Sequence, residues 1–129
     1  MIPERLRRRA AGLRHWADGV PAQLAAVELL VSFGAGRLVD GPWVRPGGFG
    51  SFWFDPDVAA EEGGHLSGGE RRVQAIASSL ASAVHPVDLS DAATGLDPDA
   101  LRFVLHALAC AGGHSASTDA PEWDHNEPR

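Results

Sequence analysis

The sequence predicts a small, mainly α-helical domain of about four helices, with a short β-hairpin or an aromatic-rich loop between the second and third helices. Three observations lead to this prediction. Apolar residues recur at helical spacing in separate stretches, Pro and Gly stand at the ends of those stretches, and aromatic residues gather between turn residues in one segment, 37–64. The 129 residues suit a single domain, expected over 1–114, followed by a polar, disordered tail over 115–129.

The first two helices are predicted from their terminal residues and apolar stripes. Pro3 suits the first turn of a helix and Gly19 the position just past its end. Between them one apolar stripe is formed by Leu6, Ala10, Leu13 and Ala17. A second helix is expected from Pro21 to the region 34–36, and its wide apolar face is typical of a central helix.

Residues 37–64 have a different character. Pro and Gly alternate there with the aromatic residues Trp43, Phe49, Phe52, Trp53 and Phe54. The pattern predicts two short strands, near 43–45 and 51–54, or an ordered loop. We expect the aromatic side chains to close the core, with an exposed recognition patch as the alternative. The acidic segment 55–64 is expected to be exposed.

Two further helices follow. Ser67 and Glu70 form a capping box, in which each side chain accepts a hydrogen bond from the other residue's backbone N–H. The stripe behind it consists of Val73, Ile76, Ala77, Leu80 and Val84, and Pro86 is expected to end the helix. A short helical turn is expected over 88–94. Asp97 and Pro98 then predict the start of a last helix that ends at 112–113, with a buried side of Leu101, Val104, Leu105 and Leu108.

The charge is negative overall and unevenly distributed. A net charge of −6 argues against a general nucleic-acid or membrane binder. The N-terminal residues 1–16 are nevertheless basic, and Arg5, Arg7, Arg8 and Arg9 are candidates for contacts with an acidic protein partner or with nucleic-acid phosphates. The alternative is a solvated helix face with Leu6 and Leu13 packed inward.

Cysteine content and hydropathy bear on the compartment. Cys110 is the single cysteine, so no intrachain disulfide can form, which suits a reducing environment. No run of about 18 uninterrupted apolar residues is present, and no secretory signal is recognised at the N-terminus. We therefore expect a cytoplasmic protein without a membrane partner. The absence of Lys and Tyr, whose codons are AT-rich, indicates a high-GC genome, and the chain is similar to short proteins common in high-GC bacteria.

Metal and catalytic constellations are not predicted. His106, Cys110 and His114 recur every four residues, but Gly112 and Gly113 are expected to end the helix before His114. The paired carboxylates at 55/57, 61/62, 88/91 and 97/99 lie beside turns and helix starts, where they stabilise the helix dipole. The sequence predicts no catalytic residue, no metal site and no cofactor.

One segment, residues 66–97, carries a family resemblance. It reads LSGGERRVQAIASSLASAVHPVDLSDAATGLD and resembles, without a gap, the signature-to-D-loop region of ABC-transporter ATPases. The family pattern is LSGGQ or LSGGE, a helix of the RQRVAIARAL type, and LLDEPTSGLD. The matching residues are Leu66, Ser67, Gly68, Gly69, Glu70, Ala75, Ile76, Ala77, Leu80, Gly95, Leu96 and Asp97. The resemblance covers about a quarter of the chain.

The departures from that family exclude ATP hydrolysis by this chain alone. Ser90 stands where the family has its Mg²⁺-linked Asp, and Asp91 replaces the catalytic Glu. No G-x-x-x-x-G-K-[ST] segment is present, and none can be, because the chain has no Lys. A triphosphate needs that cation within a glycine-rich cradle.

The resemblance implies a weak anion site at Ser67, Gly68, Gly69 and Glu70, because in the family this helix start meets the ATP γ-phosphate held by the opposite subunit. Helix capping alone explains the same residues. We expect a non-enzymatic binding or accessory module whose partner is a protein. Two alternatives remain open: a degenerate ABC-type fragment that completes a partner's nucleotide site, and a nucleic-acid-contacting accessory protein that uses the Arg-rich helix.

Overall fold

A computed structural model describes residues 2–114. The elements are α1 (Glu4–Ala17), α2 (Pro21–Ser32), the 3₁₀ segment η1 (Phe33–Asp40), β1 (Val44–Gly48), β2 (Ser51–Phe54), α3 (Pro56–Glu62), α4 (Gly68–Ala81), α5 (Leu89–Thr94) and α6 (Pro98–Ala111). The expected helical fold with a short β-hairpin is confirmed. The expected tail, 115–129, lies outside the described residues.

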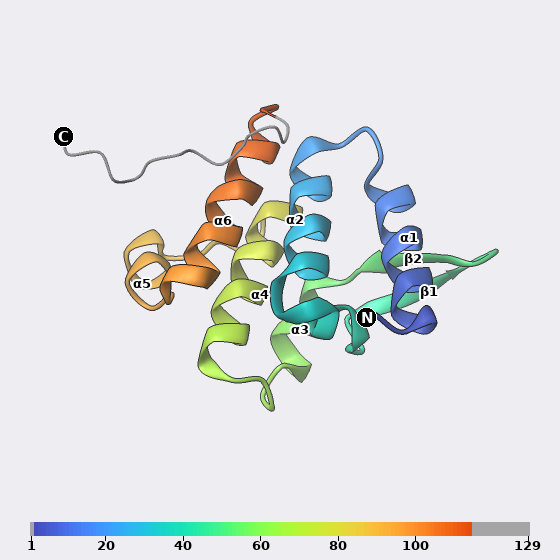
Figure 1. Ribbon diagram of the computed structural model, residues 1–129, viewed down its shortest axis with the longest axis horizontal. Coiled ribbons are helices and arrows are strands. Elements are labelled where there is room, and N and C mark those ends of the chain that lie inside the picture. The colour runs from blue at the N-terminus through green and yellow to red at the C-terminus, as the bar shows by residue number, and fades with distance from the viewer. Residues whose placement is uncertain (1, 115–129) are drawn as a thin grey trace.

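The helix α2 is the centre of the molecule. It packs against α4 and α6 on one side and α1 on the other, while the hairpin lies against α1 and α5 lies at the outer edge beside α6 (Figure 1). Its buried residues are Ala25, Ala26, Val27, Leu29 and Leu30. The wide apolar face of the second helix therefore has the expected role.

The continuous helical stretch Pro21–Asp40 is long and apolar enough, by length and composition, to cross a membrane. It is not one straight helix, however. The α-helix ends at Ser32, and Gly34, Ala35 and Gly36 have positive φ angles within η1. Its first part forms the centre of the core, so burial within this fold accounts for its apolar character.

The hairpin is antiparallel, with Val44 opposite Phe54 and Arg45 opposite Trp53. Trp43, just before β1, and Phe54 are buried, whereas Phe52 and Trp53 are half-buried and Phe49 at the tip is fully exposed. The Trp43 indole N–H donates to the Leu38 carbonyl at 2.6 Å. Trp43, Phe52 and Phe54 thus close the core, as expected, whereas Phe49 and Trp53 do not belong to it.

The segment 55–64, expected to be exposed, contains the helix α3. The Asp55 side chain accepts hydrogen bonds from the backbone N–H groups of Asp57 and Val58, and Pro56 occupies the first helical position. The same Asp-Pro signal starts α6. A buried Ala59 attaches α3 to the core, so the segment is only partly exposed.

Two expected buried faces are wrong at their ends. The helix α4 stops at Ala81, well before Pro86, because the chain turns at Ser82, and Val84 is consequently 77% exposed. On α6, Val104 is buried as expected, but Leu105 and Leu108 remain 43% and 45% exposed. The helical period identifies the apolar side of α6 correctly, but no element within residues 2–114 covers its outer part.

Candidate functional site

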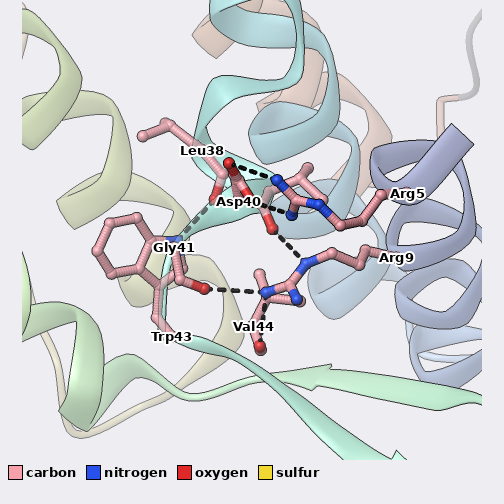
Figure 2. A network of polar contacts seen from close by, with 8 residues as sticks. Arg5, Arg9, Leu38, Asp40, Gly41, Trp43 and Val44 are labelled. Carbon is pink, nitrogen blue, oxygen red and sulfur yellow. Dashed lines mark hydrogen bonds and ion pairs between the residues drawn. The ribbon is translucent and has the colours of Figure 1, made fainter. Parts of the chain in front are cut away.

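The structure divides the predicted arginine cluster into two pairs. Arg7 and Arg8 are exposed, and both lie near Glu4, at 2.7 Å and 3.7 Å. Arg5 and Arg9 turn toward the η1–β1 connection instead (Figure 2). The basic helix therefore does not present all four guanidinium groups together to a partner.

Arg9 is a structural residue of the fold. Its guanidinium donates to the backbone carbonyls of Val39 at 2.9 Å, Gly41 at 3.1 Å and Val44 at 2.9 Å (Figure 2). Burial lowers the pKa of Arg9 from its ordinary value. Beside it, the Arg5 guanidinium donates two hydrogen bonds to the Asp40 carboxylate in a bidentate pair. This hydrogen bonding holds the pKa of the Asp40 carboxyl below its ordinary value.

The predicted anion site at the start of α4 is occupied by its own side chains. The Glu70 backbone N–H donates to the Ser67 hydroxyl at 3.1 Å, and the Ser67 backbone N–H donates to the Glu70 carboxylate at 3.0 Å. The second carboxylate oxygen of Glu70 lies 3.1 Å from Arg37. A Cβ atom at Gly68 or Gly69 would meet no atom within 4 Å, so the space above these two glycines is open.

The second half of the ABC-like segment also consists of helix caps. Asp88 accepts from two backbone N–H groups at the start of α5, and Asp97 accepts from Ala100 N–H at the start of α6, at 2.8 Å. Asp91 lies 3.6 Å from Arg72, whose side chain fills the space above Gly95. Helix capping and side-chain packing therefore explain the presence of these residues without a bound nucleotide.

His106 and Cys110 of α6 and His114, which follows that helix, do not gather into a metal site. Cys110 is half-buried, and His106 and His114 are exposed. In the part of the chain that the structure describes, no group of three His, Cys, Asp or Glu residues is arranged to hold a metal ion.

The structure brings together three side chains that sequence reasoning did not connect. The imidazole of His85 lies with Nε2 2.9 Å from Asp57 Oδ1 and with Nδ1 3.0 Å from Ser82 Oγ. Ser82 and His85 are close in sequence, which is a visible local signal. Asp57 belongs to α3, and only the tertiary fold supplies it.

This Ser–His–Asp arrangement is suited to structure more than to nucleophilic catalysis. Acyl transfer would require N–H donors aimed at an oxyanion beside the hydroxyl. The backbone N–H of Val84 instead donates to the Ser82 hydroxyl itself, at 3.3 Å. We call Ser82, His85 and Asp57 the latch, because they tie the segment after α4 to the start of α3.

An apolar groove lies between α4, α5 and α6. Its volume is about 190 Å³, and its walls are almost entirely apolar. Three large side chains that line it are also exposed to solvent: Leu89 at 72%, Leu105 at 43% and Leu108 at 45%. Small-molecule sites have volumes of roughly 300–1,000 Å³, so this groove suits a few side chains of a partner better than a ligand.

A second, larger hollow lies between α3, the face of α4 from Arg71 to Ser78 and the segment 85–87. Its volume is about 400 Å³ and its lining is partly polar. The polar residues that line it are Glu61, Arg71, Gln74, Ser78 and His85. None of them was predicted as a site residue, because their positions on three segments converge only in the fold.

No family model, no curated protein and no solved structure matches this chain. Its function therefore has to be inferred from the contacts of its own residues.

Proposed function

We propose that this protein is a non-enzymatic binding module that docks a protein partner in the groove between α4, α5 and α6. The observation that carries the proposal is the exposure of Leu89, Leu105 and Leu108 around one groove. Exposed apolar surface that gathers in one place, instead of being scattered, is typical of interaction sites. Removing these leucines from water would drive association.

The charge around the groove defines the partner more closely. Exposed carboxylates surround its α5 side and the start of α6, at Asp88, Asp91, Asp97 and Asp99, against two arginines, Arg72 and Arg102. Complementary charge guides association and excludes wrong partners. The partner surface is therefore an amphipathic helix with apolar residues on one face and Lys or Arg beside them.

Site-specific photo-crosslinking in cells tests this proposal. A photoreactive amino acid replaces Leu105 in one variant and Val20 in a control variant. Val20 is 44% exposed but belongs to the turn between α1 and α2, which lies away from the groove. We expect one discrete protein adduct from position 105 and none from position 20.

The same adduct must depend on the groove. The double substitution Leu89→Ser and Leu108→Ser, added to the position-105 variant, is expected to remove it without unfolding the domain, because both side chains are exposed. An adduct that survives this change, or that forms equally from position 20, rules out docking in the groove.

The open surface above Gly68 and Gly69 favours a second candidate, a degenerate ABC-type fragment that contributes its signature to a partner's nucleotide site. An anion on another subunit could approach these two positions without a steric clash. This candidate predicts ATP-dependent association with a separate P-loop protein. Association that is absent, or equal with and without ATP, contradicts it.

A further inference from the structure

We propose that the hollow between α3 and α4 is a binding site for a small monocarboxylate with a short apolar body. This site shares only Val87 with the groove, and it does not depend on the protein-binding proposal. It follows from the arrangement of hydrogen-bond donors along α4 and from the walls that face them.

The donors form a row on one face of a helix. Arg71, Gln74 and Ser78 follow one another at intervals of three and four residues, which places them side by side along α4. Arg71 is exposed and, within residues 2–114, forms no ion pair. Its planar guanidinium matches the two oxygens of a carboxylate.

Gln74 provides the second observation. Its side chain is only 3% exposed, yet its amide nitrogen has no hydrogen-bond partner among the described residues. A buried donor without a partner destabilises the protein, and such groups are rare unless they have a role. The nitrogen itself is fully buried, and the other end of the amide, Oε1, lies beside Gly63, which lines the hollow. A half-turn of the amide would present its N–H groups to the hollow and leave the oxygen, in place of the nitrogen, without a partner.

The remaining walls select against a doubly charged anion. Glu61 lies at the rim, and the C-terminal end of α3 at Gly63 presents the negative end of a helix dipole. Both groups repel any anion, and they repel phosphate, with its higher charge, more strongly than a monocarboxylate. Ala59, Ala75 and Val87 supply apolar surface for a short hydrocarbon part.

The latch keeps the hollow open. Both ring nitrogens of His85 have partners, Ser82 and Asp57, so the imidazole forms a wall and does not serve as a free donor. Because the latch joins the 82–87 segment to α3, the site is preformed and its volume of about 400 Å³ falls within the usual range for small ligands.

NMR titration of the ¹⁵N-labelled full chain with butyrate tests the site, with butyramide and inorganic phosphate as comparison probes. We expect butyrate to shift the amide resonances of residues that line the hollow, and the other two probes to shift them about tenfold less at equal concentration. No saturable shift with butyrate, or an equal response to butyramide or phosphate, overturns the proposal.

Two variants identify the donors. Arg71→Ala is expected to weaken butyrate binding about tenfold, whereas Arg102→Ala, on the exposed face of α6, leaves it unchanged. Gln74→Leu is expected to abolish binding and at the same time raise the midpoint of urea unfolding, because it removes a buried donor without a partner. Gln74→Leu that binds butyrate as the unaltered protein does, or that lowers the unfolding midpoint, contradicts the role of Gln74.

Discussion

The Arg9 guanidinium donates to the Val44 carbonyl at 2.9 Å and so joins α1 to the start of the hairpin, 35 residues away in sequence. The same group also donates to the carbonyls of Val39 and Gly41, and the Gly41 carbonyl accepts a hydrogen bond from the Val44 backbone N–H as well. Arg9 further lies over the Phe52 ring, 5.2 Å from its centroid. A residue first considered for partner binding is thus part of the tertiary structure.

Arg9→Ala is expected to lower the free energy of unfolding by about 2 kcal/mol, because it leaves three partly buried carbonyls without their charged donor. The stability of Arg9→Lys is expected to lie between those of the unaltered protein and Arg9→Ala, since one ammonium group cannot replace all the N–H donors of the guanidinium. Urea unfolding followed by circular dichroism measures both. Arg8→Ala is the matched control and is expected to change stability by less than about 0.5 kcal/mol. An equal loss at both positions would contradict the assigned role.

Gly41→Ala is expected to destabilise the protein by about 3 kcal/mol. The backbone of Gly41 has a φ of −90°, which alanine adopts readily, so the effect is steric alone. A Cβ atom there would lie 2.1 Å from the indole of Trp43, which is fully buried. Thermal or urea unfolding measures the change.

The control for that substitution is Gly64→Ala, where a new Cβ meets nothing within 4 Å. It is expected to change stability by less than about 0.5 kcal/mol. Comparable losses at the two glycines would indicate a conformational effect of glycine and not a clash with Trp43.

Local signals in the sequence were sufficient wherever a contact spans three or four residues. The capping box of Ser67 and Glu70 and the start of α6 at Asp97 were predicted because donor and acceptor are neighbours in the chain. The start of α3 at Asp55 and Pro56 carries the same signal, although the acidic character of 55–64 by itself favours an exposed segment.

Contacts between distant residues could not be predicted from the sequence. The latch needs Asp57 beside His85, 28 residues away, and Arg9 needs three carbonyls from 30 to 35 residues away. The groove illustrates a different limit. Helical periodicity identifies Leu105 and Leu108 as the apolar side of α6, but only the placement of α5 decides that this side stays uncovered.

Asp40→Asn is expected to make the free energy of unfolding less dependent on pH in the acid range. The hydrogen bond from Arg5 lowers the pKa of Asp40 in the folded protein, so this carboxylate stabilises the fold above its unfolded pKa of about 4. That contribution is lost as the pH falls through the lower, folded pKa. The stability difference between the unaltered protein and Asp40→Asn should therefore be largest at neutral pH and disappear in acid.

Urea midpoints measured from neutral pH down to about pH 3 test this expectation. The stability difference between the unaltered protein and Arg5→Gln should shrink in the same way as the pH falls. This substitution removes the hydrogen bond that lowers the Asp40 pKa. If the stability difference between the unaltered protein and either variant stays constant from neutral pH to about pH 3, or grows in acid, the Arg5–Asp40 pair does not stabilise the fold through ionisation of Asp40.

Ser67→Ala and Ser67→Asp together separate helix capping from anion binding at the start of α4. Ser67→Ala removes the acceptor of the Glu70 N–H and is expected to cost about 1 kcal/mol in urea unfolding. Ser67→Asp retains a capping oxygen, so stability should stay within about 0.5 kcal/mol of that of the unaltered protein.

The aspartate also adds a negative charge beside Gly68 and Gly69, where an anion of a partner would have to approach. If Ser67→Asp folds normally yet loses an ATP-dependent association that the unaltered protein shows, the helix start receives a phosphate. Loss of stability with Ser67→Asp as large as with Ser67→Ala would instead show that the capping oxygen is not what the Ser67 side chain contributes.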